Sequence, residues 1–101
     1  MSDPQIVFLN DAFVPLDEAR VPVLDRGFIF GDGIYEVVPV YGGRPFRLAE
    51  HLARLERSVG EISLALPESL ERIEEIQKEL VKRNNLVSGL VYLEVTRGAG
   101  T

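Results

Sequence analysis

The side chain whose type and position best suit a binding role is that of Arg54, which lies between Ala53 and Leu55 at the margin of an apolar helical stripe. An arginine at such a margin has two uses. It can lay its aliphatic stem along the core and keep its charge in water, or it can bind an anion through two parallel N–H groups. The residue and its neighbours leave both uses open.

A second candidate is Tyr35, which follows the turn-forming residues Gly31, Asp32 and Gly33. A tyrosine in this setting is more often a strand aromatic than a catalytic phenol. The glycines lack the spacing of a phosphate-binding or dinucleotide-binding loop, and neither the lysine nor the third glycine of such a loop is present. They predict a tight turn in which glycine supplies a positive φ and Asp32 caps its own backbone.

Metal and thiol chemistry have little support in this sequence. His51 is the only histidine and the chain has no cysteine. Disulfides, thiolate metal sites and a cysteine nucleophile are therefore excluded. We expect His51 to serve in packing or at the surface, and we assign no metal-binding residue.

Composition indicates one globular domain. The 101 residues are 46% hydrophobic and 27% charged, with a net charge of -5. This dispersed negative charge argues against a nucleic-acid partner. No apolar stretch approaches the roughly 20 residues that span a bilayer, and the opening residues MSDPQIVFLN do not resemble a signal peptide. We expect no membrane partner and a cytoplasmic location.

Several runs rich in β-branched and aromatic residues predict strands, and turn-forming pairs separate some of them. Val21–Leu24 is predicted to be a short extended segment. Pro39 cannot donate to a ladder, so it predicts an edge position or a bulge within its strand. The predicted strands are Ile6–Leu9, Ala12–Leu16, Ile34–Tyr41, Arg44–Leu48 and Leu90–Thr96.

Two helices are predicted by apolar residues that recur every three or four positions. Ser69 is a good N-cap for the second helix, which Asn84 and Asn85 end. The predicted fold class is α+β: a small antiparallel-rich sheet with two helices packed on one face. The two apolar stripes comprise Leu48, Leu52, Leu55, Val59 and Ile62, then Leu70, Ile73, Ile76, Leu80 and Val81.

The run DRGFIFGDGIYEVVPVYGGRPFRLAEHLARLERS resembles the N-terminal signature of the fold-type IV (class IV) pyridoxal-phosphate aminotransferases. That family includes D-amino acid aminotransferases, branched-chain aminotransferases and aminodeoxychorismate lyase. The segment GDGIYEVV is most similar to the D-alanine aminotransferases. The matching blocks are Asp25–Gly27, Phe30–Gly33, Tyr35–Val37, His51–Leu55 and Val95–Gly98.

The resemblance implies a cofactor, substrates and site residues. It implies that Arg54 binds the phosphate of pyridoxal 5'-phosphate, that Tyr35 helps to hold the substrate carboxylate, and that Val37 shapes the pocket. The substrates would be an amino acid, with D-alanine or another D-amino acid favoured, and a 2-oxo acid. The protein would be a homodimer. Branched-chain aminotransferase and aminodeoxychorismate lyase activities remain alternatives within the family.

The lysine that holds this cofactor as a Schiff base has no candidate here. The only lysines are Lys78 and Lys82, both on the polar face of the second predicted helix. The resemblance places the reactive lysine in a later domain. We therefore interpret residues 1–101 as the N-terminal small domain of such an enzyme, without a catalytic residue and inactive alone.

A stand-alone, non-enzymatic dimerisation module is the alternative from another class. Phe28, Ile29, Phe30 and Ile34 form an apolar cluster in the sequence. Without a second domain this cluster would be partly uncovered, and such a surface favours self-association.

Overall fold

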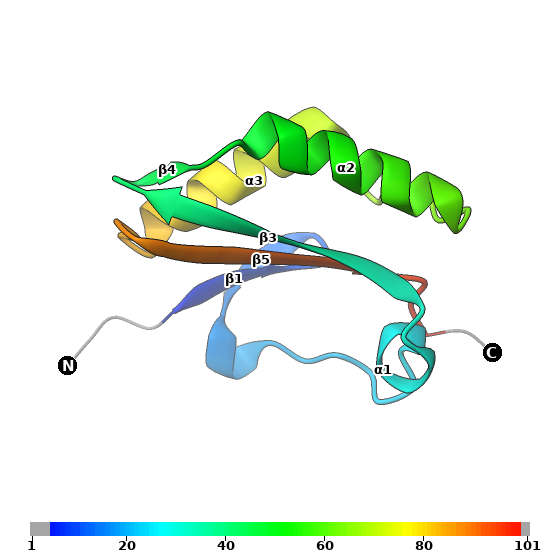
Figure 1. The fold of residues 1–101 in the computed structure, drawn as a ribbon. Helices are drawn as coiled ribbons and strands as arrows, with labels where there is room; N and C mark the ends of the chain where they lie inside the picture. Colours follow the sequence, from blue (N-terminus) through cyan, green and yellow to red (C-terminus); the bar gives the residue numbers. More distant parts are fainter. Residues whose placement is uncertain (1–4, 100–101) are drawn as a thin grey trace.

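The computed structural model describes residues 5–99, which form two long helices and two small antiparallel sheets (Figure 1). The predicted α+β class is confirmed, with the strands divided between two sheets. Within residues 5–99, no helix has the length and apolar character needed to cross a membrane. The elements are β1 (Ile6–Leu9), β2 (Ala12–Pro15), the 3-10 helix η1 (Leu16–Glu18), α1 (Arg26–Phe30), β3 (Gly33–Tyr41), β4 (Arg44–Pro45), α2 (Leu48–Glu61), α3 (Leu70–Arg83) and β5 (Gly89–Thr96).

The larger sheet has the strand order β4-β3-β5, with β3 at its centre, and β1 and β2 pair separately as a hairpin. The pairing of β3 with β5 runs in continuous register from Gly33 opposite Thr96 to Val40 opposite Gly89. Alternation along β3 buries every second residue from Glu36 to Val40 on one face. That face is the one covered by helices.

Both long helices lie together on that face of the larger sheet (Figure 1), as predicted. The buried residues of α2 follow the predicted stripe from Leu48 to Val59. Leu55 is completely buried and shares one core cluster with Val38 and Val40 of β3. The burial of these apolar side chains, rather than helix propensity, supplies most of the stability of such short helices.

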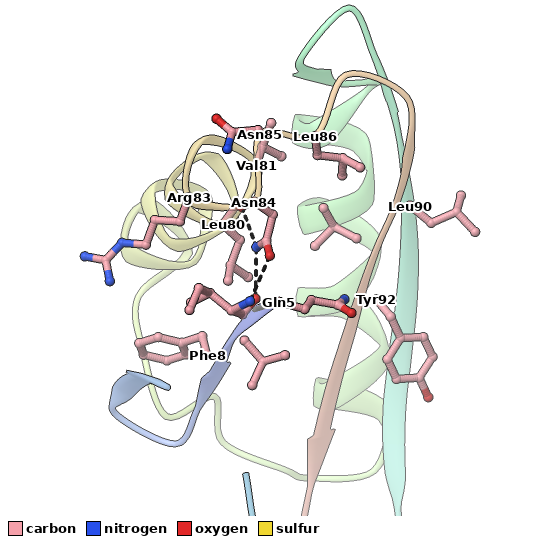
Figure 2. A pocket seen from close by; sticks show the side chains of 13 residues that line it. Gln5, Phe8, Leu80, Val81, Arg83, Asn84, Asn85, Leu86, Leu90 and Tyr92 are labelled. Carbon is pink, nitrogen blue, oxygen red and sulfur yellow. Dashed lines mark hydrogen bonds between the residues drawn. The ribbon is translucent and has the colours of Figure 1, made fainter. Parts of the chain in front are cut away.

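The helix ends show local causes. The predicted N-cap Ser69 accepts a hydrogen bond from the backbone N–H of Arg72 through its hydroxyl, at 3.1 Å. At the other end of α3, the side chain of Asn84 hydrogen-bonds both the backbone N–H and the carbonyl of Ile6 in β1, at 2.8 and 2.9 Å (Figure 2). Asn84 therefore ends α3 as predicted and also docks β1 against it.

Figure 2 also shows the hollow around Asn84, which lies between β1, the end of α3 and β5. Tyr92 belongs to its lining, but the predicted site residues Arg54, Tyr35 and Val37 do not. The predicted site residues lie instead on β3 and on α2, which packs against it.

Two strands are shorter than predicted. β2 ends at Pro15, because Leu16 begins the 3-10 helix η1. β4 ends at Pro45 rather than Leu48, because Arg47 adopts a left-handed conformation with φ of 54° directly before α2. A residue with positive φ cannot continue a strand.

Residues 21–30 differ more from the prediction. Val21–Leu24 forms no strand, and a turn occupies its last two residues. The helix α1 follows, capped by the Asp25 carboxylate, which accepts from the backbone N–H of Gly27 at 2.9 Å. Sequence periodicity misses α1 because its five residues are too few to show a helical period.

Pro39 lies in the central strand β3, one residue beyond the end of the ladder with β4, and the alternative of a bulge is wrong. The β3–β5 register continues through Pro39 opposite Leu90 without an inserted residue. The carbonyl of Pro39 accepts from the backbone N–H of Phe46 at 2.7 Å. Because a strand residue directs its N–H and C=O to the same side, the missing N–H of Pro39 faces the side where β4 has ended.

Two glycines should respond oppositely to alanine. A Cβ at Gly33 would lie 2.7 Å from the carbonyl oxygen of Val95, so Gly33→Ala should lower the free energy of unfolding by about 1–3 kcal/mol. A Cβ at Gly60, in α2, would meet no atom within 4 Å. Gly60→Ala should therefore stabilise the protein by up to about 0.5–1 kcal/mol. Urea unfolding measures both changes, and changes of the same sign would contradict this assignment.

Candidate functional site

A buried carboxylate lies in the middle of the larger sheet. Glu36 occupies the row of β3 that faces the helices, next to the fully buried Val38, and is itself only 5% exposed. A buried carboxylate is costly unless it is paired and hydrogen-bonded. Two residues of α2, His51 and Arg54, supply its partners. We call Glu36, His51 and Arg54 the carboxylate clamp.

The clamp has a specific geometry. Nε of Arg54 donates to Oε2 of Glu36 at 2.8 Å, and Nη2 of Arg54 donates to Oε1 at 2.7 Å. Nδ1 of His51 lies 2.8 Å from the same Oε1. His51 and Arg54 are three positions apart on α2, so both project from one side of the helix. The apolar stripe of α2, which includes the buried Leu55, packs on β3 and thereby places His51 and Arg54 next to Glu36.

These contacts favour the charged form of Glu36. The hydrogen bond from Arg54 is the main cause that lowers the pKa of Glu36, burial opposes it, and the hydrogen bond from His51 lowers this pKa further. The bond to Glu36 in turn raises the pKa of Arg54. An ionised carboxylate only accepts hydrogen bonds, so Nδ1 of His51 must carry the hydrogen. The role of His51 in this structure is to donate to Glu36.

Arg54 retains donors for a second anion. The clamp uses two of the five N–H groups of a guanidinium. The other three, on Nη1 and the outer side of Nη2, have no hydrogen-bond partner within the described part of the chain, and 57% of the Arg54 side chain is exposed. Their planar fork matches two oxygens of a phosphate or carboxylate. The geometry fits the predicted phosphate ligand, and this role stays a prediction.

Tyr35 and Val37 lie on the opposite face of β3. The ring of Tyr35 stacks on that of Tyr92 in β5, with centroids 5.7 Å apart and an angle of 18° between the planes. Val37 is the pairing partner of Tyr92. The hydroxyl of Tyr92 donates to Glu94 at 2.5 Å, and this bond is the main cause that raises the pKa of Tyr92 to about 12. The predicted residues Tyr35 and Val37 thus share a surface with a second tyrosine.

The structure does not bring Arg54 and Tyr35 onto one face of the sheet. Arg54 is paired with Glu36 on the helix side, whereas Tyr35 is on the other side. Within residues 5–99, β4 forms ladder pairs only with the last two residues of β3. The remaining edge of β3 has no neighbouring strand there. A ligand that contacts both Arg54 and Tyr35 must therefore lie across this edge.

The Gly-Asp-Gly turn beside that edge is held by an arginine rather than by its own aspartate. Gly31 has the predicted positive φ, 64°, and ends α1. The carboxylate of Asp32, predicted to cap its own backbone, instead accepts from Nε of Arg97 at 2.7 Å, because β5 brings this cation alongside the turn. Nη2 of Arg97 also donates to the carbonyl of Ile62 at 2.7 Å. Arg97 thus connects β5, the turn and the end of α2.

Sequence reasoning misses Glu36 and Tyr92 as site residues and gives His51 no specific partner. A signal for Glu36 exists: strand alternation places it in the same row as Val38 and Val40, where an acid requires a cation. Tyr92 has no comparable local signal, because its proximity to Tyr35 depends on the register between two distant strands.

Comparisons of the sequence with known proteins agree on one family. The family described as "Amino-transferase class IV" matches residues 33–101. The chain is 46% identical over 92 residues to a D-alanine aminotransferase of Staphylococcus aureus, which covers 91% of this chain and 33% of that protein. The chain spans about a third of the length of the curated relatives it matches. These matches confirm the resemblance that the motifs indicated.

Solved structures give the same result. A T.th. branched-chain amino acid aminotransferase, complexed with N-(5'-phosphopyridoxyl)-L-glutamate, aligns with a TM-score of 0.90 and 30% identity over 100% of this chain and 35% of that chain. The branched-chain amino acid aminotransferase of Escherichia coli aligns with a TM-score of 0.87 over 95% of this chain and 34% of that chain. At 23% identity, this second likeness shows the fold alone.

The tautomer of His51 is a direct test of the clamp. Because Glu36 can only accept, the neutral ring should carry its hydrogen on Nδ1 in the folded protein. Long-range proton–nitrogen NMR reports the tautomer, and the signal needs no assignment because His51 is the only histidine. Glu36→Gln should increase the population protonated on Nε2. A neutral native ring that carries its hydrogen on Nε2 alone would contradict the bond to Glu36.

The clamp should also make stability depend on pH in the acid range. The folded-state pKa of Glu36 lies below its ordinary value of 4.5. The contribution of the ionised carboxylate is therefore fully present above that ordinary value and is lost as the pH falls through the lower folded-state pKa. Glu36→Gln should reduce the free energy of unfolding at neutral pH by about 1–3 kcal/mol.

Urea unfolding over a pH series checks this expectation. The stability difference between the native protein and Glu36→Gln should shrink as the pH is lowered below 4.5. Glu50→Gln is the matched control, because Glu50 pairs with Arg47 on the exposed side of the same helix. Surface pairs of this kind contribute little. A difference for Glu36→Gln that stays constant with pH would rule out the assigned ionisation.

Proposed function

Since the chain belongs to the class IV aminotransferase family, we propose that the protein carrying it transfers an amino group between an amino acid and a 2-oxo acid. The cofactor we propose is pyridoxal 5'-phosphate. When bound, it supplies an electron sink for the negative charge that develops on the substrate. The observation that carries this proposal is the half-exposed guanidinium of Arg54, held by a buried carboxylate and with three donors that no group in residues 5–99 accepts from.

The residues of this chain would bind and orient rather than react. Arg54 would hold the cofactor phosphate, and Tyr35, 64% exposed, would donate its hydroxyl to the substrate carboxylate. Val37 would shape the wall beside Tyr35. The pocket would lie across the uncovered edge of β3, where a ligand can reach both faces of the strand. Lys78 lies on α3 and pairs with Glu74 at 3.7 Å, so it is not proposed to hold the cofactor.

We propose D-amino acids as the preferred substrates. The chain is 46% identical to a D-alanine aminotransferase and 30% identical to a branched-chain amino acid aminotransferase over similar shares of its length. The similarity in sequence thus favours the first substrate class. A homodimer is proposed as the assembly, as the family resemblance implies. In this chain α1 presents Phe28 and Phe30 with 78% and 74% of their surfaces exposed, and the rest of the protein or a second copy would cover them. Exposed apolar side chains grouped in this way favour association.

An assay of the complete gene product tests the substrate class. With 2-oxoglutarate as acceptor, D-alanine should be converted to pyruvate faster than L-alanine or the branched-chain L-amino acids. Pyruvate formation can be followed with lactate dehydrogenase. Exclusive use of branched-chain L-amino acids would exclude the D-specific proposal. Lyase activity on aminodeoxychorismate without transamination would exclude the reaction class itself.

The same assay has a matched pair of variants for the substrate-side role of Tyr35. Tyr35→Phe removes the proposed donor and should raise KM for the amino acid by about tenfold, the value of one hydrogen bond to a charged group. Tyr41→Phe removes a similarly exposed hydroxyl from the end of the same strand and should leave KM unchanged. Equal effects of the two substitutions would count against Tyr35.

A further inference from the structure

We propose that Glu36 is a positioning residue for the cofactor phosphate: its buried carboxylate fixes the plane of the Arg54 guanidinium and aims the free Nη1–Nη2 edge at the phosphate. This inference rests on the proposed function, because it assigns a task to the group that holds Arg54. Glu36 itself touches neither cofactor nor substrate, since it is enclosed between β3 and α2 and only 5% of it is exposed.

The N–H donors of Arg54 lie on two edges of the guanidinium, and Glu36 occupies only one of them. The two bonds to Glu36 leave from Nε and the inner side of Nη2, so they define the plane of the guanidinium. The opposite edge, formed by Nη1 and the outer N–H of Nη2, then points away from Glu36. Two parallel donors on this edge can bind two oxygens of one phosphate. The clamp therefore leaves the phosphate-binding fork free and sets its direction.

Glu36 is held in place through both its backbone and its side chain. Its backbone lies in the central strand β3, in continuous register with β5 opposite Leu93. Oε1 of Glu36 accepts from both Arg54 and His51, so the carboxylate is held from two directions. Because the carboxylate is fixed in the sheet, its two bonds also fix the Arg54 side chain, which is 57% exposed.

The positioning of Arg54 by Glu36 and the negative charge of Glu36 should have opposite effects on phosphate binding. An arginine loses considerable rotamer freedom when it is immobilised, and a partner that orders it in advance removes this loss from the binding step. The negative charge of Glu36 acts in the opposite direction, because it weakens the attraction between Arg54 and an anion. A positioning role therefore predicts weaker phosphate binding when Glu36 is altered, whereas a charge role predicts stronger binding.

The experiment compares pyridoxal 5'-phosphate with pyridoxal, which lacks the phosphate, as probes for the complete gene product prepared without cofactor. Absorbance titration gives the Kd of each probe. Glu36→Asp keeps the charge but draws the carboxylate back from Arg54. It should weaken binding of pyridoxal 5'-phosphate by about tenfold, as the loss of an outer partner of a binding side chain does at metal sites. Binding of pyridoxal should change by less than about twofold, because it makes no phosphate contact.

Three further single variants and one double variant make the result decisive. Glu36→Gln should also weaken the binding of pyridoxal 5'-phosphate without weakening that of pyridoxal. Tighter binding of pyridoxal 5'-phosphate would show that Glu36 acts only through its charge and would overturn the proposal. Arg54→Lys replaces the fork by a point charge with no plane to orient. In this background Glu36→Asp should have no additional effect on the Kd. Glu50→Gln removes the same charge from the exposed side of α2 and should leave both Kd values unchanged.

The remaining outcomes distinguish this inference from the proposed function. If Arg54→Lys reduces the preference for pyridoxal 5'-phosphate but Glu36→Asp does not, Arg54 binds the phosphate and the positioning role of Glu36 is wrong. If neither substitution changes that preference, the phosphate role of Arg54 is wrong and the inference fails with it. Thermal unfolding and pyridoxal binding of each variant check the fold. If Glu36→Asp and Glu36→Gln reduce the affinities for pyridoxal 5'-phosphate and for pyridoxal equally, Glu36 serves only to stabilise the fold and the positioning role is wrong.

Discussion

The buried carboxylate of Glu36 constrains how α2 can lie on the larger sheet. Apolar side chains such as Leu55 and Val38 can slide against one another at modest cost, because hydrophobic burial has no direction. A buried carboxylate allows no such freedom, since it must meet donors at hydrogen-bond distance. His51 and Arg54 meet it only when α2 has one rotation and one position along β3. The clamp therefore selects one arrangement among those that the apolar stripe would permit.

Strand alternation then determines what the two faces of β3 can do. With Glu36 directed to the helices, Tyr35 is directed to the other face, where it stacks on Tyr92. Arg97 holds the turn that begins β3 through Asp32 and holds the end of α2 through a backbone carbonyl. The face with Arg54 and the face with Tyr35 thus belong to one strand, and the edge of β3 lies between them. The part of the β3 edge that β4 leaves unpaired lies between the face with Arg54 and the face with Tyr35, which is why we propose the ligand there.

Much of this arrangement could be predicted, because it depends on local patterns. The apolar stripes predicted both long helices, and Ser69 and Asn84 marked the ends of the second. The prediction that Asp32 caps its own backbone is wrong, because its carboxylate pairs with Arg97, which follows the distant strand β5. The stacking of Tyr92 on Tyr35 was not predicted, because it depends on the register between two distant strands. The short helix α1 was missed because five residues show no period. The motif block Tyr35–Val37 gives no partner for Glu36, although strand alternation places this acid in the buried row, where it requires a cation.

Stability alone does not account for a carboxylate in that row. Val38 and Val40 fill the next two positions and are completely buried, so another apolar side chain would continue the core without desolvating a charge. Buried ion pairs are frequently no more stabilising than apolar residues of similar volume. What the ion pair adds is direction, because a carboxylate that accepts from two nitrogens holds the plane of Arg54. The net stability gained from such a pair is small, whereas its two bonds define the plane of an exposed guanidinium, so the orientation of Arg54 explains the placement of Glu36 better than the strength of the core does.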